Sequence, residues 1–376
     1  MSTGLEGVVA ASTRLSRVDG EAGTLILAGY AVEDLAPHAT FEEVVALFLT
    51  TYSSNASSDL VAGRKLSPAT IDTTYSSNAS SDLVAGRKLS PATIDVLHHA
   101  AARRAPPMDA LLMATPTLEG DALTAIAAFP TIVGTYWRLL HGENPVPVRD
   151  DLSHAAHYLH QLSGVEPTPE RVRALETYLI TVCDHGLNAS TFTARVIAST
   201  HSDVISAITG ALGALKGPLH GGAPGPALDM VFEIGTPDRA EAVIRSKLNA
   251  GERLMGFGHR VYRVRDPRAD VLAAAAERLY ENGADRRTYE LARSIERTAL
   301  RVLHEHKPDR RLDTNVEFYT ALLLHGLGLP TELFTPTFAV GRVLGWCAHY
   351  HEQLRDGRLI RPQSEYIGPV GLQYVA

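Results

Sequence analysis

The sequence predicts a nearly all-α protein, and three observations support this fold class. Of the 376 residues, 45% are hydrophobic and 20% are charged, which is enough apolar material for a large buried core. Helical patterning dominates the chain, and only the first 30 residues resemble strands. No alternation of strands and helices follows them, so a doubly wound α/β sheet is not expected. At the average helix length, a chain of this size would hold roughly 15 or more helices.

The N-terminal segment predicts a short β-hairpin. Apolar runs at Gly7–Ala11 and Gly23–Ala28 lie on either side of Asp19-Gly20, a dipeptide typical of tight turns. The two runs are therefore expected to pair as short strands.

A 23-residue segment occurs twice in succession. Residues 50–72 and 73–95 are identical at every position. Solenoid repeats diverge and need about three or more copies to bury a core. The pair therefore indicates a recent tandem duplication or an error in the sequence, with a functional repeat as a third reading. Its Ser, Thr, Asn and Ala content predicts that at least one copy forms a surface loop.

The rest of the chain carries clear helix start and stop signals. These are cap residues and Pro at the beginning, acidic residues in the first turn, and Gly or Pro past the end. The expected helices run from Thr236 to Gly251, from Asp266-Pro267 through Val271–Tyr280 to Gly283, and over Arg287–His306, Val316–Leu327 and Thr337–Arg355.

Charge and cysteine content exclude several classes of protein. The net charge is −7, which argues against a general nucleic-acid binder. Two cysteines, Cys183 and Cys347, exclude a disulfide scaffold and a four-cysteine zinc module. Met1–Gly7 does not resemble a secretory signal, and we expect no apolar stretch of about 18 residues that would span a membrane. A cytoplasmic protein is therefore expected. The excess of Arg over Lys reflects codon bias or a need for bidentate anion binding.

Two segments place a histidine next to glycines. Residues 184–193 contain His185 and Asn188 at the end of a helical pattern, which suits either a ligand site or a capped helix junction. Residues 216–223 place His220 between Gly-Pro and Gly-Gly. Glycines let a ligand approach the backbone, and an exposed imidazole can exchange protons; a plain interhelical turn is the alternative.

Two further segments add arginines and a carboxylate. In Met255–Arg268, His259 follows Gly-x-Gly and Arg268 begins a helix whose free N–H groups attract anions. The alternative there is a solvated basic loop. In Asp313–Tyr319, Glu317 lies in the first turn of a helix, as a reacting carboxylate or as an ordinary helix-start acid. The spacing of histidines, acids and cysteines is not typical of a metal site, so no metal is expected.

These segments resemble the citrate synthase family over nearly the whole chain. Gly256–Arg268 resembles the family's Gly-x-Gly-His followed by Asp-Pro-Arg, and Gly217–Gly221 resembles its Gly-Pro-x-His-Gly. His185 with Asn188–Thr191 resembles its first histidine motif. The duplicated segment is the exception. The resemblance implies a helical fold of two domains, a large one of residues 1–216 and 321–376 and a small one of residues 217–320.

The resemblance also implies the reaction and its residues. The family condenses acetyl-CoA with oxaloacetate and hydrolyses the product to citrate and CoA. A carboxylate removes a methyl proton, histidines stabilise the enol and polarise the keto group, and arginines bind the carboxylates. The implied catalytic residues are His220, His259 and Glu317; those for oxaloacetate are His185, Asn188, Arg268, Arg342 and Arg361; those for CoA are Leu254, Met255, Gly256, Phe257, Gly258, Arg263 and Asn315.

Glu317 departs from the family pattern. The family usually has aspartate where this sequence reads Asn315-Val316-Glu317-Phe318-Tyr319. Glutamate has a similar intrinsic pKa but is one methylene longer, so the site is adjusted, the activity is weak, or another acyl-CoA is preferred. We expect an adjusted site.

The implied partners are oxaloacetate, acetyl-CoA and a second copy of the chain. Arg361 resembles an arginine that reaches into the neighbouring subunit, which implies a homodimer with shared active sites. CoA enters as a co-substrate, and no cofactor is implied. The alternatives are a 2-methylcitrate synthase that uses propionyl-CoA, and a low-activity acyl-CoA-binding homologue.

Overall fold

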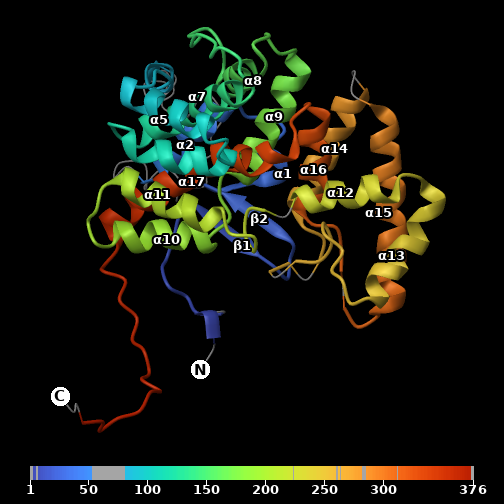
Figure 1. Ribbon diagram of the computed structural model, residues 1–376. Coiled ribbons are helices and arrows are strands. Elements are labelled where there is room, and N and C mark those ends of the chain that lie inside the picture. The colour runs from blue at the N-terminus through green and yellow to red at the C-terminus, as the bar shows by residue number, and fades with distance from the viewer. Residues whose placement is uncertain are drawn as a thin grey trace.

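The fold is almost entirely helical, as expected, with one small sheet (Figure 1). The computed structural model describes residues 3–5, 7–52, 81–222, 224–259, 261–262, 264–281, 285–310 and 312–373. The short 3₁₀ turns are Thr3–Leu5, Thr115–Thr117, Pro237–Arg239 and Thr331–Leu333. The longer helices are α1 (Val32–Leu35), α2 (Phe41–Tyr52), α5 (Pro91–Ala102), α6 (Pro107–Ala114), α7 (Ala122–Leu140), α8 (His154–Ser163), α9 (Pro169–Val182), α10 (Ala189–Ala198), α11 (Val204–Leu215), α12 (Pro224–Ile234), α13 (Ala240–Asn249), α14 (Pro267–Glu281), α15 (Arg286–His306), α16 (Val316–Gly326) and α17 (Phe334–Asp356).

The sheet differs from the expected hairpin in its first strand. Strands β1 (Ser16–Asp19), β2 (Thr24–Leu27) and β3 (Tyr30–Ala31) form an antiparallel sheet in the order β1-β2-β3. The turn at Asp19-Gly20 is confirmed, because the Asp19 carboxylate accepts hydrogen bonds from the next backbone N–H groups. The expected strand at Gly7–Ala11 is wrong: the run is apolar in sequence, but residues 7–11 form no strand and Val9 is 87% exposed.

The expected C-terminal helices are present with small shifts at their ends. Residues 236–251 begin with a 3₁₀ turn before α13, and α14 and α15 begin at Pro267 and Arg286. Helix α17 begins at Phe334, earlier than expected, because Pro336 lies in its first turn, where proline costs no hydrogen bond. Of the duplicated segment, only residues 50–52 and 81–95 are described, so the expected loop lies mostly outside the described residues.

Helix α7 is a long apolar helix that lies mostly in the interior. By length and composition it could cross a membrane, and 67% of its most apolar 18-residue stretch is buried inside the molecule. It packs against α5, α6, α8 and α17, which is typical of the core helix of a globular protein. The helix runs through Pro130 and Gly134 without a break.

Helix α17 is the centre of the packing. It contacts α2, α7, α9, α10 and α11, and Trp346 on it is fully buried. Helices α12, α13 and α15 lie together on the side where α14 and α16 meet α9 (Figure 1). The division of the chain at residues 217 and 320 stays a prediction.

Candidate functional site

His185 lies in the short connection between α9 and α10. Asn188 begins α10, and its side-chain oxygen accepts the N–H of Thr191 at 3.1 Å, which caps the helix. Gly186 has a φ of +58°, a conformation that glycine adopts at little cost. The capped junction therefore exists, and it also places His185 at the site.

His185 meets His259 and Tyr262 from the Gly-rich loop. The His185 Nε2 lies 3.1 Å from the Tyr262 hydroxyl oxygen, and the two imidazole rings are 5.8 Å apart. Burial, together with the charges of Arg268 and Arg342, holds the pKa of His185 well below its ordinary value. Tyr262 was not singled out in the sequence, although it lies in the same motif as His259.

His259 presents an N–H group to the site. Its Nδ1 accepts hydrogen bonds from the backbone N–H groups of Val261 and Tyr262, at 3.0 and 3.1 Å. Two donors at Nδ1 place the proton of the neutral imidazole on Nε2. Arg268 Nη2 lies 3.3 Å from Nε2 but has no acceptor, so the Nε2 proton is left for a ligand. Burial and the nearby Arg268 lower the pKa of His259 to about 4, so the ring is neutral at pH 7.

Arg268 is fixed by a carboxylate on its own turn. Its Nε and Nη2 donate to the two oxygens of Asp266 at 3.0 and 2.8 Å, and both residues are buried. Such a bidentate pair sets the plane of the guanidinium. Asp266 was visible in the sequence only as part of the Asp-Pro-Arg motif.

Arg342 is a buried guanidinium without an ion pair among the described residues. It is 1% exposed, and its Nε donates to the carbonyl of Val182 at 2.6 Å. Its Cζ lies 4.7 Å from the ring centre of Phe338. Burial lowers its pKa to about 10, which still leaves it charged at pH 7. A buried charge of this kind is stabilised by an anionic ligand.

His220 is held by a serine that the sequence analysis did not assign. The His220 Nε2 lies 2.8 Å from Ser190 Oγ, which accepts the indole N–H of Trp346 at 3.1 Å. Burial and the charge of Arg342 lower the pKa of His220 to about 4. The only sequence signal for Ser190 was its place in the motif of Asn188.

The glycine-rich loop is tied to the start of α16. Gly258 N–H donates to the Asp313 carbonyl at 2.7 Å, and the Asn315 side-chain amide donates to the Gly258 carbonyl at 2.7 Å. A Cβ on Gly256 would lie 2.9 Å from Cβ of Phe318, so only glycine allows this approach. The expected CoA residues of this loop that the structure describes are Leu254, Met255, Gly256, Phe257, Gly258 and Asn315, and Arg263 lies outside the described residues.

Glu317 lies beside this loop in the first turn of α16. Its backbone N–H is capped by the Asn315 side-chain oxygen at 3.0 Å. Burial raises the pKa of Glu317, and the charge of Arg268 opposes that rise. A carboxylate with a raised pKa is a stronger base than an exposed one.

Arg361 is not brought to this cluster. It is exposed on the extended segment that follows α17 and leads away from the body of the molecule (Figure 1). Together with Arg14 and Leu5, it lines a pocket formed by the two ends of the chain. Within one chain, it does not meet the other candidate residues.

The remaining candidates form one site around Arg268 and Arg342. His220, His185, His259 and Glu317 are linked electrostatically through Arg342 and Arg268. Neutral imidazoles can donate hydrogen bonds to a carbonyl, two guanidinium groups can bind a dianion, and the carboxylate can accept a proton. Among the described residues, no group of three or more His, Cys, Asp or Glu side chains is placed to hold a metal ion.

Comparison with known proteins identifies the family. A sequence model described as "Citrate synthase, C-terminal domain" matches residues 4–363. The chain is 37% identical to a citrate synthase of Acidithiobacillus ferridurans, over 99% of this chain and 96% of that one. It is 39% identical to citrate synthase 2 of Bacillus subtilis, over 99% of this chain and 97% of that one.

Solved structures agree in fold. The citrate synthase of Pyrobaculum aerophilum matches with a TM-score of 0.85 and 35% identity, over 99% of this chain and 94% of that one. The citrate synthase of Thermoplasma acidophilum, solved in a ternary complex with carboxymethyl coenzyme A and oxaloacetate, also has a TM-score of 0.85, at 30% identity over 100% of this chain and 98% of that one. The chain therefore belongs to the citrate synthase family and is a transferase of the citrate (Si)-synthase type.

Proposed function

We propose that the protein condenses acetyl-CoA with oxaloacetate and water to give citrate and CoA. The observation that carries this proposal is the convergence of His185, His259, Arg268 and Arg342 in one buried site. Two guanidinium groups and two neutral imidazoles there match the two carboxylates and the keto group of oxaloacetate. The oxaloacetate complex of the related Thermoplasma enzyme supports the same substrate.

Arg268 and Arg342 would bind the two carboxylates, and His259 would act on the keto group. Asp266 orients Arg268, while Arg342 has no carboxylate partner among the described residues that would compete with a substrate. The Nε2–H of His259 would donate to the keto oxygen and polarise the carbon under attack. His185 and Tyr262 would complete the oxaloacetate site, with Asn188 holding the helix start beside them.

Glu317 and His220 would form the enol of acetyl-CoA. Glu317 takes a proton from the methyl group while a neutral His220 donates a hydrogen bond to the thioester oxygen. The Ser190 hydroxyl donates to Asn188 Oδ1 at 2.8 Å and therefore accepts from His220 Nε2. For His220 to donate to the thioester oxygen from Nδ1, this hydroxyl would turn to donate to Nε2 when acetyl-CoA binds. The enol carbon then attacks the keto carbon, whose oxygen becomes a hydroxyl group, and water cleaves the thioester to release CoA.

The remaining features of the proposal concern the CoA loop, assembly and location. Residues 254–258 with Asn315 would contact CoA, and Arg263 would join them. Arg361 would act in the site of a second subunit of a homodimer, because it is exposed and apart from the site of its own chain. A cytoplasmic enzyme that needs no metal or other cofactor is proposed.

The test follows CoA release by the purified protein with oxaloacetate and either acetyl-CoA or propionyl-CoA. We expect a higher kcat/KM with acetyl-CoA and identify citrate by mass. Faster turnover with propionyl-CoA would assign a 2-methylcitrate synthase instead. Binding of both substrates without CoA release would indicate a low-activity acyl-CoA-binding homologue.

A further inference from the structure

Helix α17 presents four residues of one face to the segment that carries His185. Arg342, Gly345, His349 and Glu352 are spaced by three, four and three residues, which places them on one side of a helix. Arg342 binds the carbonyl of Val182, and the two residues at the other end contact Asp184 and Arg195. The site accounts for Arg342 alone, so the other three need an explanation.

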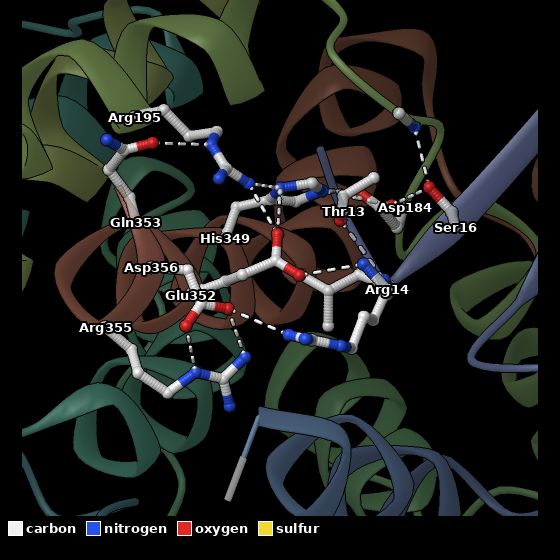
Figure 2. A network of polar contacts seen from close by, with 12 residues as sticks. Thr13, Arg14, Ser16, Asp184, Arg195, His349, Glu352, Gln353, Arg355 and Asp356 are labelled. Atoms are coloured by element: carbon white, nitrogen blue, oxygen red, sulfur yellow. Dashed lines mark hydrogen bonds and ion pairs between the residues drawn. The ribbon is translucent and has the colours of Figure 1, made fainter. Parts of the chain in front are cut away.

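His349 lies between a buried arginine and a buried aspartate (Figure 2). Arg195 Nη1 donates to His349 Nδ1 at 2.8 Å. Arginine has no acceptor, so Nδ1 carries no proton, and the ring proton must lie on Nε2. His349 Nε2 is 3.3 Å from Asp184 Oδ2 and donates to it. The imidazole is therefore neutral, and it links the Arg195 guanidinium to the Asp184 carboxylate through one hydrogen bond to each.

The arginine end of this chain of contacts is itself fixed. Arg195 Nη1 forms an ion pair with Glu352 at 2.7 Å, and Arg195 Nε donates to the Gln353 side chain at 3.0 Å. The other Glu352 oxygen accepts the backbone N–H of Arg14 at 2.8 Å. All these side chains are at least nine-tenths buried apart from Arg14 (Figure 2).

At the other end of this chain of contacts, Asp184 and Gly186 lie directly before and after His185 in the sequence. Ser16 Oγ donates to the Asp184 carboxylate and accepts the backbone N–H of Gly186 at 3.0 Å. The residues on both sides of His185 are therefore attached to one serine of β1. Burial alone would raise the pKa of Asp184, yet His349, Arg342 and Ser16 hold it below its ordinary value.

Gly345 brings α17 close enough for these contacts. A Cβ at this position would lie 2.3 Å from the carbonyl oxygen of Cys183 and 2.8 Å from Asp184 Oδ1. Real Cβ atoms do not approach oxygen so closely. The helix face is thus fitted to the backbone of Cys183 and Asp184 one turn before His349 reaches the aspartate.

We propose that His349 is a positioning residue for oxaloacetate binding, acting through Asp184 and Ser16 on the backbone that holds His185 against Tyr262. The proposal rests on the proposed function, because it assumes that His185 contacts oxaloacetate. In this proposal the buried Arg195–Glu352 ion pair holds His349 in place. His349 touches no reacting atom, so its effect falls on the affinity for oxaloacetate rather than on the affinity for CoA.

The test compares His349→Phe with the parent protein. Phenylalanine fills the space but leaves Asp184 and Arg195 each without one hydrogen bond. We expect the Kd for oxaloacetate, measured by calorimetry, to rise on the order of tenfold. The KM for oxaloacetate should rise with it, while the KM for acetyl-CoA stays within about twofold.

Two variants separate positioning from general damage to the fold. His349→Gln keeps one donor and one acceptor, and it should recover most of the oxaloacetate affinity. His154→Phe is the matched control: His154 is equally buried, but it lies on α8 and its ring nitrogens have no hydrogen-bond partner in the described part of the chain. It should leave both KM values unchanged, whatever it does to the melting temperature.

If His349→Phe does not fold, Ser16→Ala tests the same path from the partly exposed strand β1. It removes the contact to Asp184 and Gly186, and we expect the oxaloacetate Kd to rise several-fold. An unchanged Kd in the variant that folds would overturn the proposal.

A double-variant cycle tests the route through His185. If His349 acts through His185, adding His349→Phe to His185→Ala should raise the oxaloacetate Kd no further than His185→Ala alone. Full additivity would overturn the proposed route. A parent protein that binds no oxaloacetate would instead overturn the proposed function, so the two failures are distinguishable.

Discussion

Glu317 is the residue at which this chain departs from its family. Its backbone is capped by Asn315, and its carboxylate lies within electrostatic reach of Arg268 and Asp266. Because burial raises its pKa, the side chain is suited to accept a proton. The loop beside it is held to the start of α16 by the hydrogen bond from the Asn315 amide to the Gly258 carbonyl.

Substitution of Glu317 tests its role as the base. Glu317→Gln should remove turnover but retain oxaloacetate binding, because an amide cannot accept the methyl proton and both arginines remain. Glu317→Asp should lose activity by a factor on the order of 10–100, since a shorter arm misplaces the base by about 1 Å. Steady-state kinetics and calorimetry measure both effects.

Opposite results would be equally informative. If Glu317→Asp is faster than the parent, the natural glutamate is a handicap and the weak-activity alternative gains support. Near-parental turnover of Glu317→Gln with both acyl-CoA substrates would show that another group is the base.

At the scale of elements, the duplicated segment contributes different parts of its two copies to the described fold. Residues 50–52 end α2, and residues 81–95 include the Ser90 cap and the first turns of α5. In a single 23-residue unit these would be the first three and the last fifteen positions. Five positions would remain between them, which is an ordinary length for a helix connection.

We therefore expect deletion of residues 53–75 to leave a folded, active enzyme. The deletion joins Tyr52 to Ser76 and restores one intact unit. Its melting temperature and kcat should stay within a few degrees and about twofold of the parent.

The control deletion removes residues 53–95, and with them the buried Arg87 and the Ser90 cap. It should lower the melting temperature markedly. Aggregation of the 53–75 deletion together with the control would contradict the expectation and indicate that both copies are needed.

At the scale of the whole molecule, buried neutral histidines make stability depend on pH. Burial, with the nearby charges of Arg87 and His160, lowers the pKa of His157 from 6.5 to about 3. Below pH 6.5 the unfolded chain binds a proton that the folded chain does not, so this contribution to stability is full above pH 6.5 and is lost as the pH falls toward 3.

Replacement of His157 should weaken this pH dependence. Between pH 7 and 5, the free energy of unfolding of the parent should fall by about 2 kcal/mol more than that of His157→Gln. Urea unfolding at both pH values measures the difference. His98→Gln, on the exposed side of α5, is the control and should follow the parent. Equal pH dependence in all three proteins would contradict the assigned shift.

Arg361 lies on a segment that is suited to contact a second copy of the chain. The segment that carries it follows α17 and is exposed, while Ile360 before it is anchored by its N–H to Ser199 Oγ at 3.1 Å. Such an anchored, outward-leading arm suits a contact with a second copy of the chain.

Mixing two defective variants tests a shared site. Arg361→Ala should raise the oxaloacetate KM, and His220→Ala should nearly abolish condensation. Hybrid dimers of the two should recover part of the activity, because one site in each hybrid would be intact. No recovery in hybrids verified by mass would argue that each site is built from one chain.

The sequence by itself determined the helical class, the approximate bounds of the helices between residues 236 and 356, and the motifs of the site. Local signals were sufficient there, since Pro267 begins a helix and Asn188 and Asn315 cap theirs. The same local logic failed at Gly7–Ala11, because an apolar run forms a strand only where a partner strand or core receives it.

Only the tertiary structure decided which residues meet. Tyr262, Ser190 and Asp266 became visible as partners of His185, His220 and Arg268 once distant segments were brought together. The burial that keeps His220 and His259 neutral and raises the pKa of Glu317 is likewise a property of packing. Residue types specify which chemistry is possible, but protonation and hydrogen-bond direction depend on desolvation and neighbours, which no local pattern encodes.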